Sequence, residues 1–245
     1  YPSLSRETIR FVGNAESVLV RSPGFEIKGE PEVVWNRRPS QYVDPSQVDA
    51  RDLAFAEMSC MLARRSLYGF IAPNAFWVND ANAALRARHK PIQQREAIRA
   101  GFVTPDTLYT NDAEEIRAFI HANGGKIIFK PYASLPWADE KKAYVPFSVL
   151  IGAADLVNDR LLQAAPGIFQ AYVPKAFELR VTAMGNRLFA VKIDSQESHR
   201  GRIDWRLGGS EMPMEGFDLP RTIASRCLEV MERLGIVFGC FDLVV

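Results

Sequence analysis

Two lysines stand at positions from which they could bind phosphate. Lys130 closes the apolar run Ile127-Ile128-Phe129, where burying an ammonium group is costly unless an anion meets it. Lys90 directly precedes a proline at the start of a predicted helix. Two lysines from separate elements can clamp a polyphosphate, because each is a compact charge on a flexible stem. Position alone also allows a solvated helix residue at Lys90 and a strand-end side chain that reaches water at Lys130.

Four more charged residues alternate along two segments that read as a β-hairpin. Glu178 and Arg180 are two positions apart and share a face of their strand, as do Lys192 and Asp194 on the next strand. We expect all four on one ionic face, which could hold ribose hydroxyls, phosphates and an acyl intermediate. An exposed sheet face with cross-strand ion pairs would give the same pattern.

Asp242 is the single acid in the otherwise apolar segment 237–245. A carboxylate in such a strand needs a cation or a hydrogen-bonding partner. The sequence therefore predicts either a bound cation or a hydrogen-bonding partner at Asp242.

Composition and motifs exclude several other classes. The 30 Lys and Arg residues balance 29 Asp and Glu residues, so no overall charge would attract nucleic acid or an anionic membrane. No apolar run is long enough to span a bilayer, and the sequence contains no basic, apolar, small-residue succession typical of a signal peptide. The three cysteines are widely spaced and form no zinc or disulfide pattern, which favours a cytoplasmic location. Histidine pairs at metal-binding spacing, a serine nucleophile elbow and glycine-rich nucleotide loops are all absent.

Alternating strands and helices must position these groups. The predicted strands cover residues 32–38, 76–78, 103–109, 126–132, 167–173, 178–184, 187–194 and 237–245. The predicted helices cover residues 46–65, with Asp44 or Ser46 as cap, 81–100 with a break at Pro91, a segment that ends at 120 with Asn111 or Asp112 as cap, and 220–234. The turn Gly185-Asn186 joins the two strands of the hairpin. This order indicates a mixed α/β (α+β) protein.

The order of several short motifs resembles the ATP-grasp ligases. The runs Arg88-His89-Lys90-Pro91 and Ala100-Gly101-Phe102-Val103-Thr104-Pro105 resemble the entry to the central domain of that superfamily. Ile127-Ile128-Phe129-Lys130-Pro131 looks like its phosphate-binding strand, Glu178-Leu179-Arg180-Val181 like its ribose and acyl-site strand, and Phe241-Asp242-Leu243 like its first magnesium carboxylate. The nucleotide hinge would be formed by Phe169, Gln170, Ala171, Tyr172 and Val173.

Within the superfamily, the details resemble the graspetide ligases, the microviridin-type macrocyclases related to the glutamate ligase RimK. The matching runs are Trp35-Asn36-Arg37-Arg38-Pro39, Trp77-Val78-Asn79, Thr110-Asn111-Asp112, Val173-Pro174-Lys175 and Ile193-Asp194-Ser195-Gln196. The resemblance implies an enzyme that activates Asp or Glu side chains of a ribosomal precursor peptide as acyl phosphates. The enzyme would then join them to Ser, Thr or Lys side chains as ester or amide crosslinks.

The resemblance also implies a fold, a site and partners. We expect an ATP-grasp fold with a pre-ATP-grasp domain (residues 1–80), a central subdomain (81–166) and an antiparallel C-terminal subdomain (167–245). ATP would have Lys90 and Lys130 on its phosphates, the hinge around adenine and Glu178 on ribose, while Asp242 would hold Mg²⁺. Arg180 and Lys192 would stabilise the acyl phosphate, and residues 133–144 would form a lid. A precursor peptide and a second copy of the chain are the expected partners.

One departure and two alternatives qualify this interpretation. The family has a Glu-x-Asn metal motif on the strand after that of Asp242, and the sequence stops at Val245, so we expect a missing or truncated segment there. A ligase that adds a free amino acid to a carboxylate is the first alternative. The second is a nucleotide-binding regulatory module without catalysis.

Overall fold

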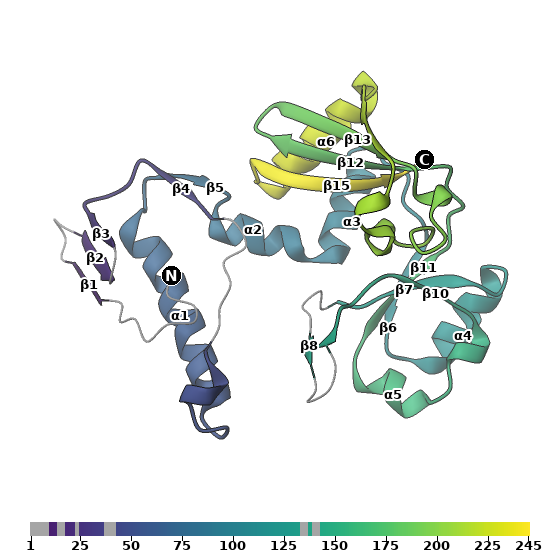
Figure 1. Ribbon diagram of the computed structural model, residues 1–245, viewed down its shortest axis with the longest axis horizontal. Coiled ribbons are helices and arrows are strands. Elements are labelled where there is room, and N and C mark those ends of the chain that lie inside the picture. Colours follow the sequence, from purple (N-terminus) through teal and green to yellow (C-terminus); the bar gives the residue numbers. More distant parts are fainter. Residues whose placement is uncertain (1–9, 14–17, 23–24, 37–42, 133–136, 139–142) are drawn as a thin grey trace. The chain divides into compact units, whose positions relative to one another are not determined.

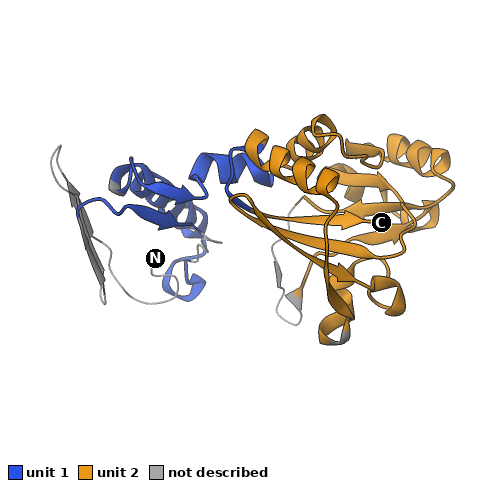
Figure 2. Cartoon of the chain, turned by 90° about the horizontal axis from the view of Figure 1, so that it is seen from above, with its two compact units in different colours: residues 1–88, 234–238 blue, residues 89–233, 239–245 orange. Residues whose placement is uncertain are grey.

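The computed structural model describes residues 10–13, 18–22, 25–36, 43–132, 137–138 and 143–245. The chain forms two compact units (Figure 2). The first comprises residues 1–88 and 234–238, and the second comprises residues 89–233 and 239–245. The predicted domain boundaries at residues 80 and 166 stay predictions.

The first unit combines a small antiparallel sheet, a parallel strand pair and two helices. β1 (Arg10–Gly13), β2 (Val18–Ser22) and β3 (Phe25–Lys28) pair antiparallel in that order and were not predicted. β4 (Val33–Trp35) pairs parallel with β5 (Phe76–Val78), which confirms both predicted strands. Leu67 and Ala72 form a small core with Val34, Phe70, Ala75 and Trp77. The predicted motif residues Arg37, Arg38 and Pro39 lie outside the described residues.

The first long helix begins later than the sequence indicated. Asp44 does act as a cap, but its carboxylate caps the 3₁₀ turn Pro45–Gln47, which ends where Val48 becomes extended. α1 then covers Leu53–Ile71, so the predicted range 46–65 was wrong at both ends. The break at Pro91 is confirmed: α2 (Ala81–Arg88) ends before it and α3 (Lys90–Arg99) has proline in its first turn, where a missing N–H costs nothing.

The second unit contains a four-stranded sheet in the order β10-β7-β11-β6, with α4 and α5 beside it (Figure 1). Its strands are β6 (Thr107–Thr110), β7 (Ile127–Lys130), β10 (Val149–Ile151) and β11 (Gly167–Ala171). The helices are α4 (Ala113–Ala122), which Asp112 caps as predicted, and α5 (Asp159–Ala164). Ile116 and Ile120 of α4 bury Ile127 and Phe169 of the sheet. Because side chains alternate along a strand, Lys130 and Gln170 project from the opposite face.

The central sheet departs from the sequence interpretation in three ways. β6 begins at Thr107 rather than at residue 103, because Pro105 interrupts the run and Val103 is 98% exposed. β11 pairs with β6 and β7, although residues 167–171 were assigned to the C-terminal sheet. β10 and α5 were not predicted.

The second sheet has the order β14-β13-β12-β15. The hairpin of β12 (Glu178–Met184) and β13 (Arg187–Ile193) is confirmed, with Gly185 at a positive φ of 56° in the turn. β15 (Phe238–Val244) and α6 (Arg221–Leu234) also match their predictions, whereas β14 (Met214–Phe217) was missed. α6 lies along one side of this sheet (Figure 1). The residues buried here are Leu179, Val181, Ala183, Cys227, Val230 and Met231.

The segment predicted as a lid is only partly described. β8 (Trp137–Ala138) pairs antiparallel with β9 (Ala143–Tyr144), and the residues on either side of β8, 133–136 and 139–142, lie outside the described part of the chain. The lid therefore stays a prediction. Among the described residues, no helix has the length and apolar character needed to cross a membrane.

Candidate functional site

Lys130 projects from the face of the central sheet opposite to α4 and is fixed there by a neutral partner. Its Nζ donates to Oε1 of Gln170 at 2.6 Å, and Gln170 Nε2 donates to Thr107 Oγ1 at 2.9 Å. An ammonium group has three donors, and Gln170 is its only hydrogen-bond acceptor among the described residues. Lys130 is therefore oriented without being neutralised.

A polar network on the same face holds Gln170 in place. Thr107 Oγ1 donates to the Pro105 carbonyl at 2.9 Å and accepts from Gln94 Nε2 at 3.0 Å. Tyr109 donates its hydroxyl hydrogen to Gln94 Oε1 at 2.6 Å. The amide groups of Gln94 and Gln170 are thus both engaged at oxygen and nitrogen, and the network joins α3 to β6 and β11. The sequence analysis missed this network.

The electrostatic surroundings of Lys130 favour an anionic ligand. Burial lowers the pKa of Lys130, and the charges of Lys90 and Lys175 lower it further, whereas Asp204 and Asp242 act to raise it. The net shift of the pKa is downward. A site that disfavours the charged ammonium in this way would gain free energy from binding phosphate oxygens.

Lys90 lies in the same electrostatic neighbourhood. Its side chain reaches solvent and donates to Gln93 Oε1 at 3.1 Å, yet the protein surrounding the ammonium group lowers its pKa. Asp242 raises this pKa and Arg206 lowers it. Both predicted phosphate lysines therefore interact with the acid predicted to hold a metal.

Arg180 and Asp242 form an ion pair between β12 and β15. Arg180 Nη1 lies 2.7 Å from each carboxylate oxygen of Asp242. The side chains are 33% and 52% exposed, so both can reach a ligand. On the neighbouring position of the same strand face, Glu178 is nearly buried and accepts from Lys175 Nζ at 2.8 Å.

A second buried acid, Asp204, was not predicted. It accepts hydrogen bonds from the Ser148 backbone at 3.1 Å and from the guanidinium of Arg206, whose Nε lies at 2.8 Å. Arg206 interacts electrostatically with Asp242 and Glu178. We call the following residues the charged cluster, in which cations outnumber acids: Lys90, Lys130, Lys175, Glu178, Arg180, Asp204, Arg206 and Asp242.

Lys192 does not belong to this cluster, and the prediction of one ionic hairpin face is wrong. The register pairs Lys192 with Leu179 and Arg180 with Val191, so Lys192 and Arg180 lie on opposite faces of the sheet. Lys192 binds Asp194 at 2.9 Å and Glu215 at 3.0 Å and lies 5.4 Å from the Phe177 ring centre. These contacts account for it as an ion-paired surface residue, and its predicted role at an acyl phosphate gains no support.

Comparison with protein-family models and with curated protein sequences gives no match. Solved structures do match. A RiPP-associated ATP-grasp ligase from Chryseobacterium gregarium, solved with ADP and a leader and core peptide, superposes with a TM-score of 0.83 at 24% identity over 98% of this chain and 73% of that protein. The macrocyclase MdnC from Microcystis aeruginosa MRC, bound with precursor peptide MdnA, gives 0.83 at 24% identity over 98% and 74%. The ATP-grasp ligase PsnB, complexed with a minimal precursor, Mg and ADP, gives 0.69 at 24% identity over 98% and 72%.

The chain has the ATP-grasp fold. This confirms the predicted fold class. Identities at this level establish the arrangement of the backbone, and the chemistry of this ATP-grasp chain rests on its own residues.

The predicted nucleotide hinge divides between the two faces of the central ATP-grasp sheet. Gln170 faces Lys130, while Tyr172 and Val173 are 37% and 39% exposed at the end of the strand. Phe169 instead lies in the core with only 2% of its surface exposed, and its ring lies 5.4 Å from that of Phe129. The Phe169 side chain is therefore a packing residue rather than a nucleotide contact. The role of Ala171, half-buried beside it, stays a prediction.

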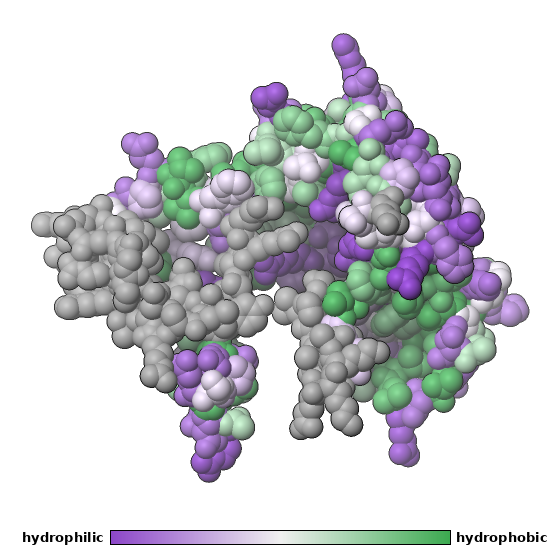
Figure 3. Space-filling view, in the orientation of Figure 1, coloured by the Kyte–Doolittle hydropathy of each residue, from purple (hydrophilic) through white to green (hydrophobic). Residues whose placement is uncertain are grey.

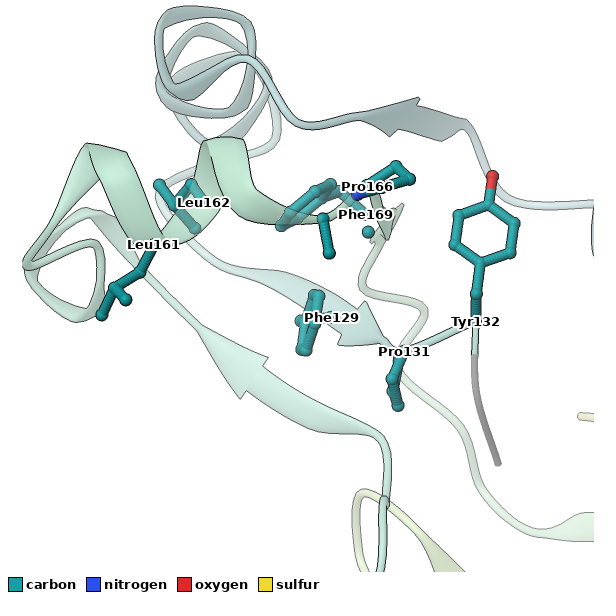
Figure 4. Close-up of a pocket in the computed structure, with 9 residues that line it drawn as sticks. Phe129, Pro131, Tyr132, Leu161, Leu162, Pro166 and Phe169 are labelled. Atoms are coloured by element: carbon teal, nitrogen blue, oxygen red, sulfur yellow. The ribbon is translucent and has the colours of Figure 1, made fainter. Parts of the chain in front are cut away.

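An apolar pocket of about 500 Å³ lies on the Phe129 and Phe169 face of this sheet (Figure 4). Leu161 and Leu162 of α5 approach it from one side, and Pro131 and Tyr132 border it beyond the end of β7. Apolar side chains also gather over this part of the unit in the space-filling view (Figure 3). Leu161 is 70% exposed, so the pocket is accessible from solvent.

The residues present fit Mg²⁺ as part of a nucleotide complex. Among the described residues, no three His, Cys, Asp or Glu side chains are grouped to hold a metal by themselves. Mg²⁺ is commonly held by one or two carboxylates together with phosphate oxygens. Asp242, half-exposed beside two lysines suited to phosphate, matches one such carboxylate.

Proposed function

We propose that this chain is an ATP-dependent carboxylate ligase that crosslinks side chains within a precursor peptide. The observation that carries the proposal is the accessible Arg180–Asp242 ion pair, with Nη1 2.7 Å from both carboxylate oxygens, whose acid also acts electrostatically on Lys90 and Lys130, two lysines from different elements. This combination of two lysines with lowered pKa values and one accessible acid suits a magnesium-bound polyphosphate.

The residues of the charged cluster divide the work of activation. Lys90 and Lys130 bind the phosphate chain, and Gln170 keeps Lys130 directed at it. When bound, Mg²⁺ neutralises charge on the phosphates, with Asp242 as one ligand. A peptide carboxylate oxygen attacks the γ-phosphorus, the bond to the β–γ bridging oxygen breaks, and ADP leaves. Arg180 stabilises the charge that develops on the acyl phosphate.

The second step forms the crosslink. A hydroxyl or amine of the same peptide attacks the acyl carbon, the carbon–oxygen bond to phosphate breaks, and the nucleophile loses one proton. The peptide has then lost the elements of one water for each bond formed. Positioning carries this step, since the acyl phosphate is already activated and must mainly be protected from water.

The peptide partner rests on two observations. The three similar ATP-grasp structures were solved with peptides, a leader and core peptide in one and precursors in the other two. The apolar pocket beside α5 is suited to apolar side chains of such a peptide and lies on the sheet face away from Lys130, so peptide and nucleotide would not compete for it. Ester or amide bonding, the cytoplasmic location and the homodimer stay predictions, and sedimentation analysis would test the last.

The decisive experiment combines the chain with ATP, Mg²⁺ and a panel of acidic peptides containing Ser, Thr or Lys. We expect ADP release together with peptides lighter by one water per bond. Lys130→Ala and Asp242→Ala should abolish both signals, whereas Lys126→Ala, an exposed lysine just before the same strand, should retain them. Turnover unchanged in both cluster variants would refute the assignment.

The same assay separates the alternatives. A ligase that adds a free amino acid would give a product heavier than the acceptor and would depend on the added amino acid. A regulatory module would bind ADP but release none from ATP with any acceptor. The charged cluster favours the ligase. Arg180 pairs with Asp242, the acid proposed for the metal–nucleotide complex, and its side chain is also accessible to a second, carboxylate substrate.

A further inference from the structure

Asp204 is a buried acid that binds both a side chain and the backbone. It is 6% exposed. Its carboxylate accepts hydrogen bonds from Arg206 Nε at 2.8 Å, from Arg206 Nη2 and from the Ser148 backbone N–H at 3.1 Å. It also caps the 3₁₀ helix Trp205–Glu211. Burial by itself would raise the pKa of Asp204, but the hydrogen bonds of Arg206 and Ser148 outweigh it and lower this pKa, so the group is an ionised carboxylate.

Arg206 is held from two directions and remains open in a third. Its Nε and Nη2 point to Asp204, and its guanidinium lies 5.2 Å from the ring centre of Phe147. Its side chain is nevertheless 48% exposed. Among the described residues, Nη1 has no hydrogen-bond partner, so one edge of a rigidly oriented guanidinium is available to a ligand.

Arg206 belongs to the charged cluster through its charge interactions. Arg206 lowers the pKa of Lys90, and the carboxylates of Asp242 and Glu178 raise that of Arg206. An ion pair this accessible contributes little to stability by itself, and a buried carboxylate costs desolvation. Stability alone therefore gives a poor account of why a buried acid holds a half-exposed arginine beside two phosphate-binding lysines.

We propose that Asp204 is a positioning residue that holds Arg206 with its free guanidinium edge toward the terminal phosphoryl group of the nucleotide. The proposal rests on the proposed function and adds to it a third phosphate-facing cation and the group that orients it. Through Ser148, the same carboxylate also fixes the backbone directly before β10. A guanidinium fork suits the equatorial oxygens of a transferred phosphoryl group, and an arginine already oriented loses less entropy on contact.

The test compares triphosphate with diphosphate binding. The ratio of dissociation constants for ADP and a non-hydrolysable ATP analogue, each with Mg²⁺, is measured by calorimetry for the wild-type chain, Asp204→Asn, Arg206→Gln and the double variant. We expect each single variant to lose about tenfold of the preference for the triphosphate, the scale of one charge-assisted contact. The double variant should lose no more than Arg206→Gln, because Asp204 acts through Arg206.

Thermal stability supplies a second readout that separates positioning from structure. Each single variant leaves one charge without its partner and should melt at a lower temperature than the wild type. The double variant removes both charges and should recover part of that loss while its triphosphate preference stays low. A purely structural pair would instead recover both properties together.

Two further variants keep the proposal falsifiable. Arg206→Lys retains the positive charge but loses the guanidinium fork. This variant replaces Asp204→Asn in the binding measurement if Asp204→Asn does not fold. Arg202→Gln removes a nearby exposed arginine, whose Nε contacts the Gln196 carbonyl, and should leave the ratio unchanged. A wild-type ratio in Arg206→Gln, or additive losses in the double variant, would overturn the inference alone. Absence of nucleotide binding by the wild-type chain would overturn the proposed function and this inference with it.

Discussion

Arg180 Nη1 contacts both carboxylate oxygens of Asp242 at 2.7 Å, so the cation proposed for the acyl phosphate and the acid proposed for the metal hold each other. The pair joins β12 to β15, which are neighbours in the sheet. A metal–nucleotide complex that takes up Asp242 oxygens would leave Arg180 donors for a carboxylate substrate. The two substrates would then be linked through one ion pair.

Arg180→Gln should separate catalysis from nucleotide binding. We expect ADP affinity to stay within about threefold of wild type, because removing Arg180 also releases Asp242. Turnover should fall by about 10²–10³-fold, the loss typical of removing one donor from a developing oxyanion. Calorimetry and ADP release measure the two effects. Arg187→Gln, at the other end of the hairpin beside Phe189, is the matched control, and equal losses of affinity and rate in Arg180→Gln would contradict the role.

Nucleotide affinity should decline with rising pH before an ordinary lysine would deprotonate. The pKa of Lys130 is lowered in the free protein, and phosphate binding requires its charged form. The affinity is therefore full below this lowered pKa and is lost as the pH rises through it, with proton uptake on binding in that window. Calorimetry in buffers of different ionisation enthalpy measures the uptake.

Lys130→Arg provides the control for this pH dependence, because an arginine keeps its proton throughout the range. The decline in nucleotide affinity that remains in this variant should then come from deprotonation of Lys90, whose pKa is also lowered. An unchanged profile in Lys130→Arg would show that Lys130 does not contact the phosphates.

Leu161→Asp should weaken peptide binding without affecting nucleotide. Leu161 borders the apolar pocket and is 70% exposed, so an acid there adds charge to the pocket with little cost to folding. We expect at least tenfold weaker binding of a crosslinked or linear peptide substrate, about the loss of one buried apolar contact plus a desolvated charge. Val157→Asp, 85% exposed and outside the pocket, should behave as wild type. Equal peptide affinity in both variants would remove the pocket from the proposed function.

Asn79→Ala should destabilise the first unit. The Asn79 amide donates to the Phe238 carbonyl at 2.7 Å and accepts from the backbone N–H groups of Val237 and Phe238 at 2.8 Å each. Losing these partners should cost about 1–3 kcal/mol. Faster hydrogen exchange at Val237 and Phe238 measures the loss locally, and Asn82→Ala, an exposed neighbour, should leave it unchanged.

The strands and helices with strong local signals could be predicted from the sequence. Pro91 ended one helix and began the next, Asp112 capped α4, and Gly185-Asn186 marked the hairpin. The sequence also contains enough information to predict that Arg180 and Lys192 lie on opposite faces of the sheet. A two-residue turn pairs Met184 with Arg187, and hence each even-numbered residue of β12 with an odd-numbered residue of β13. The alternation within each strand does not reveal this pairing, because the register between the two strands decides it.

Other features depend on contacts between distant segments. Gln94, Thr107 and Gln170 come from three elements, so no local pattern indicates that they form one network around Lys130. Asp204 and Arg206 stand in a 3₁₀ segment without periodicity. β1, β2 and β3 were also missed, and among the described strands they pair only with one another.

The alternation of β7 has a pharmacological consequence. Lys130 faces the proposed phosphate site, while the adjacent Phe129 faces the apolar pocket, so a single layer of backbone separates the two. A small apolar compound seated against Phe129 would block the peptide and leave the nucleotide in place. Its potency would then be independent of ATP concentration, and it would spare the many enzymes that a purine mimic inhibits.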